Sequence, residues 1–226
     1  MNRITYQLIE GYMLSCMADA AHDREHVYRV LFNALDIAEH EPDVDLDVLI
    51  TACLLHDVGR PEQIADPTLC HAQIGAEKAG CFLREQGFTA VFCDHVCSCI
   101  LTHRFRKSMP PVSIEAKILY DADKLDAVGA IGIARTLMYN GAVGRSLFSV
   151  AEDGRILPGS ADEPDSFLRE YQCKLTRLYD GFLTEWGALQ ARAQQQHAQQ
   201  FVRDLLTEVE PVRCSGLEKL NSMLEA

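Results

Sequence analysis

Hydrophobic positions recur every three to four residues along most of the chain, which is the spacing of one face of an α-helix. The first clear case is residues 24–40, with apolar positions Val27, Val30, Leu31, Ala34, Leu35 and Ala38. Glu41-Pro42-Asp43 breaks that segment, and Asp45 or Asp47 begins the next, which runs to Val58. Alternation typical of strands is hard to find over four or more residues, so the pattern predicts an all-α protein.

Cap residues divide the middle of the chain into further helices. A helix over 71–86 is followed by one that begins at the cap Thr89 and runs to about His103. Ser113 caps the next helix, and another helical stretch continues to about Tyr139. These segments extend the all-α pattern through the central part of the sequence.

Residues 140–164 differ in kind, because glycine and proline recur there without any periodicity. A structureless segment of this length inside a compact protein is usually a functional lid or a mobile insertion. Two helices, over about 166–187 and 189–209, then close the fold. The predicted layout is one domain over residues 1–226 with three parts: a metal-binding helical core at about 20–140, a lid-like loop at 140–164 and C-terminal helices over 165–210.

The composition is that of an ordinary soluble globular protein, with 48% apolar and 24% charged residues among 226. Its net charge of −12 argues against a nucleic-acid-binding or anionic-membrane-binding surface. The N-terminus lacks the features of a signal peptide, and no apolar run reaches transmembrane length. We therefore expect a cytoplasmic protein with neither nucleic acid nor a membrane as partner.

The nine cysteines lie mostly inside helical patterns, which suits reduced thiols in a reducing compartment. The tightest cluster is Cys93, Cys97 and Cys99. Cys93 and Cys97 share a helix face, but Cys99 lies off it, and no CxxC motif is present. The pattern therefore favours reduced thiols over a structural zinc site.

His56 and Asp57 lie at the inner end of the apolar run 49–55. Buried His and Asp side chains are costly unless they are satisfied, and a divalent cation near the negative end of a helix dipole would satisfy both. Neighbouring helical side chains point about 100° apart, so the two can converge on an ion better than they can pair. In isolation, however, a helix-terminal Asp beside a hydrogen-bonded core His is the commoner explanation.

Other potential ligands occur on both sides of His56-Asp57. His26 borders the apolar stripe of the preceding helix, and His22, four residues earlier, is a rival ligand. Residues 121–126 hold three carboxylates, which repel one another unless cations offset them; a solvated acidic face, or pairing with Lys117 and Lys124, is the alternative. Further histidines follow the His-Asp pair: His71, His95 and His103.

Taken together, this His…His-Asp…Asp pattern on consecutive helices resembles the HD-domain superfamily of metal-dependent phosphohydrolases. Four blocks look like the small bacterial HD hydrolases of about this length: residues 24–30, 54–60, 71–77 and 121–135. The resemblance covers at least residues 20–140. It implies a helical HD-domain fold and hydrolytic activity.

The resemblance implies that His26, His56, Asp57 and one carboxylate of residues 121–126 hold a metal ion. In related triphosphohydrolases the last ligand directly precedes a basic and then an apolar residue, which selects Asp123 here, with Asp121 as the alternative. Two nitrogens and two carboxylates form a borderline site open to Mn, Fe, Co, Ni, Zn or Mg. Metal-activated water would then attack phosphorus.

Asp57, His71 and His103 are the expected catalytic residues. In binuclear HD enzymes two extra histidines hold a second ion with the bridging Asp, and His71 and His103 occur in the right order for that. In mononuclear relatives the same positions contact substrate phosphate or pass protons. The sequence is therefore compatible with either one or two metal ions per chain. His95 is interpreted as a core or surface histidine.

Binding of phosphate groups also requires cationic side chains. Because the chain has a net charge of −12, the positions of its Arg and Lys residues are informative. Arg60, Lys124 and Arg104 adjoin the proposed ligands and are expected to bind substrate. Four further cations carry a weaker signal. A solvated basic loop explains Arg106 and Lys107 equally well, and Arg135 and Arg145 could line the pocket beneath the 140–164 segment.

Three functions follow. The first is a metal-dependent phosphohydrolase of nucleotides or related phosphate esters, acting between phosphates or on a terminal phosphate. The second is a diiron oxygenase, since some HD proteins use a six-residue site for oxidative cleavage. The third is a nucleotide sensor that binds without turnover.

Overall fold

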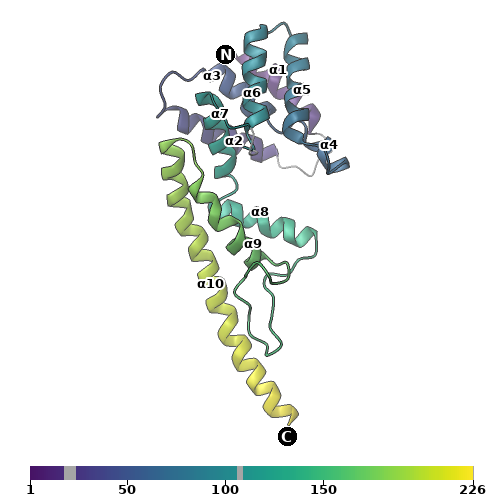
Figure 1. The fold of residues 1–226 in the computed structure, drawn as a ribbon, viewed down its shortest axis with the longest axis vertical. Helices are drawn as coiled ribbons and strands as arrows, with labels where there is room; N and C mark the ends of the chain where they lie inside the picture. The colour runs from purple at the N-terminus through teal and green to yellow at the C-terminus, as the bar shows by residue number, and fades with distance from the viewer. Residues whose placement is uncertain (18–23, 106–108, 226) are drawn as a thin grey trace. The chain divides into compact units, whose positions relative to one another are not determined.

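The computed structural model describes residues 1–17, 24–105 and 109–225, in which every regular element is a helix (Figure 1). Within the described residues, β-type pairing is limited to two isolated bridges, Ser146 with Ser166 and Val150 with Ile156. The predicted all-α class is confirmed. The elements are α1 (Arg3–Cys16), α2 (Arg24–Ala38), α3 (Leu46–Leu55), α4 (Arg60–Ala65), α5 (His71–Glu85), α6 (Ala90–Thr102), α7 (Ile114–Leu125), α8 (Gly129–Ala142), α9 (Phe167–Cys173), the 3-10 helix η1 (Leu175–Asp180) and α10 (Glu185–Leu224).

The chain divides into two compact units. The first unit is Met1–Asp126 together with Phe182–Ala188, and the second is Ala127–Gly181 together with Leu189–Ala226. The expectation that residues 1–226 form a single domain stays a prediction. Within the described residues, no helix is both long enough and apolar enough to cross a membrane.

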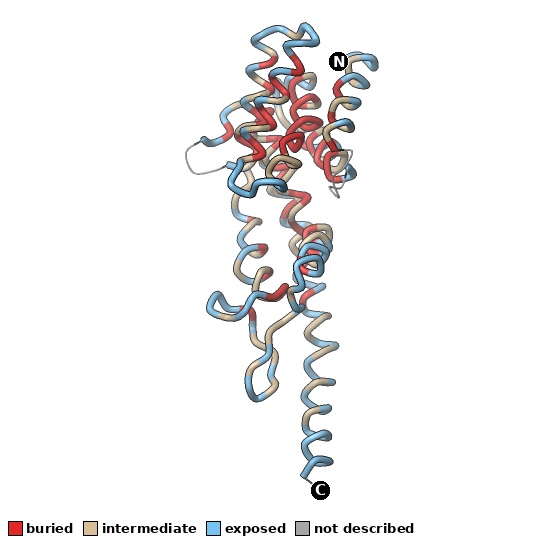
Figure 2. Tube along the Cα trace, turned by 90° about the vertical axis from the view of Figure 1, so that its right-hand side faces the viewer, coloured by how far each residue is buried: buried red, intermediate tan, exposed pale blue. Residues whose placement is uncertain are grey.

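Helix α3 is the centre of the first unit. Its sequence is apolar almost throughout, and Leu49, Ala52, Leu54 and Leu55 are fully buried. A helix that is hydrophobic on all sides must be covered on all sides, and α3 contacts α1, α2, α5, α6 and α7. Figure 2 shows the buried residues gathered among these helices. The C-terminal end of α3 therefore delivers the residues that follow it into the middle of the unit.

The predicted helix starts are confirmed where a side chain caps them. The carboxylate of Asp45 accepts hydrogen bonds from the backbone of Asp47 and Val48 at the start of α3. The hydroxyl of Thr89 accepts from the backbone N–H of Phe92 at α6, and that of Ser113 does the same for α7. Each cap satisfies a backbone donor that the helix itself leaves unpaired.

Two helices of the first unit are absent from the sequence prediction. Helix α1 buries only Ile9 and Met13, which leaves too weak a stripe to stand out in the sequence. Helix α4 begins directly after Gly59, with Pro61 in its first turn. Proline is tolerated in the first turn of a helix because its missing N–H would be unpaired there anyway.

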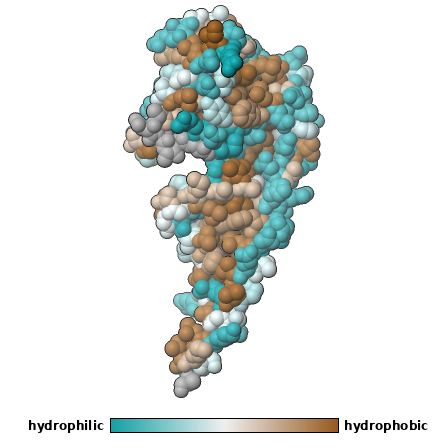
Figure 3. Space-filling view, turned by 180° about the vertical axis from the view of Figure 1, so that it is seen from behind, coloured by the Kyte–Doolittle hydropathy of each residue, from teal (hydrophilic) through white to brown (hydrophobic). Residues whose placement is uncertain are grey.

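The C-terminal part also differs from the prediction. The expected helix over 166–187 is broken into α9 and η1, and the chain leaves helical conformation again at Gly181. The last helix continues to Leu224, beyond the expected end at 209, with Pro211 inside it. Its final turns expose Val212, Leu220 and Met223, and apolar side chains appear as brown near the lower tip in Figure 3.

The segment expected as a lid over 140–164 has local order within the second unit. Its first residues complete α8, and the remainder turns back on itself at Gly154, which has φ of +85°. Leu157 N–H donates to the Ser149 carbonyl, and the Gly154 carbonyl accepts from Arg213 Nε of α10 at 2.6 Å. Its role as a lid stays a prediction.

Gly59 allows the turn after Asp57 to lie directly against α5. A Cβ atom at Gly59 would be 2.4 Å from the His71 carbonyl oxygen and 2.6 Å from the Gly75 backbone nitrogen. Both are backbone atoms, so they cannot turn aside as a flexible side chain could. This contact places the first residue of α5, His71, beside the residues that end α3.

We predict that Gly59→Ala lowers the free energy of unfolding by about 2 kcal/mol or more, because the added methyl group overlaps backbone atoms. Gly11→Ala is the matched control. Gly11 is exposed in the middle of α1, and a Cβ atom added there would have no other atom within 4 Å, so alanine should raise stability by up to about 1 kcal/mol. Urea unfolding measures both changes, and equal effects of the two substitutions would contradict the packing account.

Candidate metal centre

Six side chains of the first unit converge at the inner ends of their helices. His26 comes from α2, Asp123 from α7, and His71 begins α5. His56 and His103 are the C-terminal caps of α3 and α6, and Asp57 follows His56. The potential ligand atoms form two groups within which all atoms lie within 4.8 Å of one another: His26, His56 and Asp123, and Asp57, His71 and His103.

The carboxylate of Asp57 faces both groups. Its Oδ2 lies 3.6 Å from His26 Nε2 and 3.7 Å from His56 Nε2. Its Oδ1 lies 3.4 Å from His71 Nε2 and 3.9 Å from His103 Nε2. Asp57 therefore contributes Oδ2 to the first group, which we call the first side of the centre, and Oδ1 to the second group, which we call the second side. With Asp57 included, the first side offers two imidazole nitrogens and two carboxylates.

All four histidines are oriented in the same way. Each ring uses Nδ1 to contact an oxygen outside the centre, which leaves Nε2 directed inward. The acceptors are Asp126 Oδ2 for His26 at 2.7 Å, the Cys53 carbonyl for His56 at 2.7 Å, Gln63 Oε1 for His71 at 2.6 Å and the Ile100 carbonyl for His103 at 2.6 Å. Metal-binding histidines are characteristically held by such a contact from the second ring nitrogen.

The inward nitrogens approach one another closely. His26 Nε2 and His56 Nε2 are 3.4 Å apart, and His71 Nε2 and His103 Nε2 are 3.3 Å apart. Two nitrogen lone pairs at this distance repel unless a cation, either a proton or a metal ion, lies between them. The arrangement therefore calls for positive charge.

Electrostatics favour that charge most strongly at His26. Burial lowers the pKa of His26, but hydrogen bonds to the carboxylates of Asp123, Asp126 and Asp57 outweigh burial and raise it to about 11. Burial raises the pKa of Asp57, yet the charges of His56 and Arg60 and the hydrogen bond of His26 bring it well below its usual range. Asp57 is thus ionised, the form in which a carboxylate binds a metal.

His71 and His103 are in the opposite state. Burial is the main reason that the pKa of His71 falls to about 3 and that of His103 to about 4. The charge of Arg60 lowers the first further, and that of His56 lowers the second. Both imidazoles are therefore neutral near pH 7 and can accept a proton or a hydrogen bond, or bind a metal.

The donor atoms around His26 fit a divalent ion. Metal–nitrogen and metal–oxygen bonds of about 2.0–2.2 Å place neighbouring donor atoms about 3.0–3.5 Å apart. The contacts of His26 Nε2 with Asp123 Oδ1, His56 Nε2 and Asp57 Oδ2 are 3.4, 3.4 and 3.6 Å. On the other side of Asp57, Arg60 Nε donates to Oδ1 at 2.9 Å. A guanidinium already shares that oxygen, so the first side fits a metal better than the second.

Asp123, which the family resemblance selects as the ligand, and its alternative Asp121 occupy different environments. Asp123 faces His26, whereas Asp121 is fully buried and accepts hydrogen bonds from the backbone of Leu183 and from the backbone and hydroxyl of Thr184, at 2.7–3.0 Å. Asp121 thereby holds the start of α10. This geometry supports Asp123 as the ligand, which stays a proposal.

The three expected substrate-binding cations lie near the centre in the first unit. Arg60 contacts Asp57, and Arg104, directly after His103, is close enough for its charge to lower the pKa of His71. Lys124 Nζ donates to the Tyr120 hydroxyl at 3.1 Å. His22, Arg106 and Lys107 lie outside the described residues.

Other candidates from the sequence belong to neither group of potential ligand atoms. His95 Nε2 lies 3.0 Å from Glu115 Oε2, away from both groups. Arg135 and Arg145 belong to the second unit, where Arg145 pairs with Asp165 at 3.1 Å. The thiols of Cys93, Cys97 and Cys99 contact three different partners: the carbonyls of Phe88 and Ala76 and the hydroxyl of Ser113.

Sequence reasoning missed the residues that orient the histidines. Asp126 holds His26 and also accepts from Arg29 Nε at 2.6 Å. It lay within the acidic cluster, and a search for a histidine partner there could have identified it. Gln63 carried no signal, because only the short helix α4 brings it to His71.

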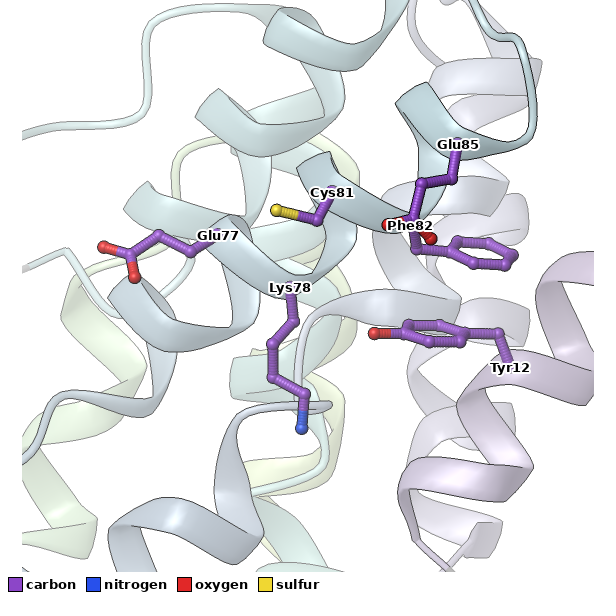
Figure 4. Close-up of a pocket in the computed structure, with 6 residues that line it drawn as sticks. All are labelled: Tyr12, Glu77, Lys78, Cys81, Phe82 and Glu85. Carbon is purple, nitrogen blue, oxygen red and sulfur yellow. The ribbon is translucent and has the colours of Figure 1, made fainter.

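A surface pocket of the first unit is separate from this centre. It has a volume of about 310 Å³ and lies between α1 and α5. Figure 4 shows the rings of Tyr12 and Phe82 one over the other at its edge, with centroids 4.0 Å apart. None of the six converging residues lines it, so it is not part of the candidate centre.

Comparison with known proteins identifies the family. Residues 24–128 match the HD domain model. The chain is 32% identical over 212 residues to the uncharacterized protein YpgQ of Bacillus subtilis strain 168, covering 87% of this chain and 90% of YpgQ. The chain belongs to the HD-domain superfamily of hydrolases. The matched segment of this HD-domain hydrolase contains all six residues of the centre.

Solved structures of HD proteins share the fold. Crystalline B. subtilis YpgQ in complex with ADP is 28% identical, with a TM-score of 0.70 over 90% of this chain and 97% of YpgQ. An HD-superfamily hydrolase from Bacillus thuringiensis is 28% identical, with a TM-score of 0.69 over 91% and 97% of the two chains. A predicted HD-superfamily hydrolase from an uncultured Thermotogales bacterium is 30% identical, with a TM-score of 0.60 over 91% and 92%.

We predict different effects of substituting Asp123 and Asp121 by alanine. Asp123→Ala should weaken binding of Mn²⁺ by more than about 100-fold, because it removes a donor from the four-residue set. Asp121→Ala should leave metal affinity nearly unchanged but lower the free energy of unfolding by about 2–3 kcal/mol, since buried donors lose their acceptor. Metal titration and urea unfolding of both variants measure this. The reverse assignment of the two effects would show that Asp121 is the ligand.

Proposed function

We propose that this HD-domain hydrolase cleaves a phosphate ester or anhydride bond of a nucleotide, with a divalent metal ion held by His26, His56, Asp57 and Asp123. The observation that carries the proposal is the inward set of these donors around His26, where positive charge is strongly favoured. Mn, Co, Ni, Fe, Zn and Mg all accept such a mixed set of nitrogen and oxygen donors.

Two observations support a nucleotide as substrate. The relative YpgQ was crystallised with ADP, and it shares the fold over 90% of this chain. Arg60 and Arg104 lie close to the centre and Lys124 directly follows Asp123, although the whole chain has a net charge of −12. Arginine and lysine are the side chains that recognise phosphate groups.

A bound divalent ion would lower the pKa of a water molecule and offset negative charge on the phosphoryl group. The protein's own residues supply the rest of the chemistry. Asp57, ionised between the two histidine pairs, fixes the position of the donor set, and Arg60 holds Asp57 in place. His71 and His103 are neutral, so their inward Nε2 atoms can accept a hydrogen bond from the attacking water and orient it.

The diiron oxygenase is the second candidate, because His71, His103 and Asp57 Oδ1 form another group of three donors. The hydrogen bond from Arg60 to Oδ1 weighs against it. A guanidinium on that oxygen competes for the lone pair and repels a second cation. The sensor hypothesis would use the same nucleotide site without hydrolysis.

The test is release of phosphate or pyrophosphate from a panel of nucleotides with Mn²⁺ or Co²⁺. We predict turnover by the natural chain and a loss of at least about 1,000-fold in Asp57→Ala, because several kcal/mol of transition-state stabilisation disappear with the donor set. Asp204→Ala, at an exposed position of α10 in the second unit, is the control and should retain activity.

The same assay separates the alternatives. Two tightly bound irons per chain with no hydrolysis of any nucleotide would favour the oxygenase. Tight binding of a nucleotide with no released product would favour the sensor. Either result contradicts the proposed hydrolysis.

A further inference from the structure

Three aromatic side chains gather at one side of the metal centre. Phe105 follows α6, Tyr120 is part of α7, and Phe182 precedes α10. The rings of Phe105 and Tyr120 meet edge to face, with centroids 5.7 Å apart and planes at 82°. Lys124 Nζ lies 5.2 Å from the centre of the Tyr120 ring and 4.9 Å from that of Phe182. All four residues belong to the first unit.

This aromatic group adjoins the donor set through two elements. Phe105 comes two residues after His103, and Tyr120 lies one helical turn before Asp123 on α7. Besides burial, the charges of Asp121 and Asp123 raise the pKa of the Tyr120 phenol, which shows that these carboxylates are close to it. The aromatic group therefore lies on the Asp123 side of the centre.

The Asp123 side is also where the centre reaches solvent. The side chain of Asp123 is 24% exposed, whereas those of the other five converging residues are exposed by at most 6%. A substrate phosphate that reached the donor set from this side would enter beside Asp123. The remainder of the substrate would then lie next to the aromatic group.

Phe105 has two features that its role in packing does not explain. Its residue surface is 42% exposed, although the almost fully buried His103 lies only two positions before it. Its backbone has φ of +39°, a left-handed conformation that side-chain-bearing residues other than Asn and Asp seldom adopt. Strained backbone of this kind clusters at ligand-binding sites.

We propose that Phe105, supported edge-on by Tyr120, is the platform on which the base of the nucleotide stacks while its phosphates reach the metal centre. This inference rests on the proposed function. An edge-to-face partner holds the Phe105 ring in place and leaves a flat face for a second ring. Stacking accepts any base, so the platform predicts selection for a nucleoside over a bare phosphate chain rather than for one particular base.

The test compares two non-hydrolysable ligands of the Mn²⁺-loaded protein by calorimetric titration: α,β-methylene-ADP and methylenediphosphonate, which carries the same phosphonate pair without the nucleoside. The natural chain should bind the nucleotide analogue at least about tenfold more tightly. Phe105→Ala should weaken that ligand by about tenfold and leave the diphosphonate unchanged. Phe105→Trp should retain the affinity, whereas Phe105→Leu, which keeps an apolar side chain without a ring, should not.

Phe32→Ala is the matched control, because it also removes an exposed phenyl ring from the first unit, and both affinities should stay unchanged. Equal loss for both ligands in Phe105→Ala, or no loss for either, would overturn the platform and leave the proposed function standing. Failure of the natural chain to bind either ligand would overturn the proposed function, and the platform with it.

Discussion

The first unit is organised around one buried carboxylate, that of Asp57. A charged carboxylate with almost no exposure is very unfavourable unless its surroundings compensate it. Four histidine nitrogens within 3.9 Å and the guanidinium of Arg60 supply that compensation from several elements. The helix ends that carry these groups, whether N-terminal or C-terminal, must therefore meet at one place. The packing of α2, α5 and α6 about α3 satisfies this electrostatic constraint as well as burying the core.

Backbone contacts outside the centre make this convergence specific. The Nδ1 atoms of His56 and His103 each contact a carbonyl three residues earlier in the same chain segment, so the end of a helix sets the direction of its own histidine. Gly59 and Gly75 let the turn after Asp57 touch α5, which fixes the distance to His71. A site held by helix ends and backbone contacts keeps its donor atoms directed inward, and such preorganisation is what metal-dependent hydrolysis requires.

The sequence was most informative where local rules and the family resemblance agree. Helix starts at Asp45, Thr89 and Ser113 follow from local capping chemistry, and the structure confirms them. The residues that converge could also be named from the sequence, because their spacing matches a known family, whereas their roles as ligands stay a proposal. The HD-domain family and the all-α fold are confirmed.

What escaped prediction depends on contacts between distant segments. Gln63 orients His71 only because α4 folds back on α5, and Asp121 differs from Asp123 only because Leu183 and Thr184 come to it from 62 and 63 residues away. The grouping of Phe105, Tyr120 and Phe182 has the same origin, since no pattern in one segment reveals a partner in another. Helical periodicity also gave no sign that the last helix continues past residue 209 to Leu224.

The most direct test of the account is anomalous X-ray diffraction from crystals of the full chain grown with Mn²⁺. The account predicts a strong manganese peak enclosed by Nε2 of His26, Nε2 of His56, Oδ2 of Asp57 and the carboxylate of Asp123. No peak at that position, or a peak only among His71, His103 and Oδ1 of Asp57, would contradict it.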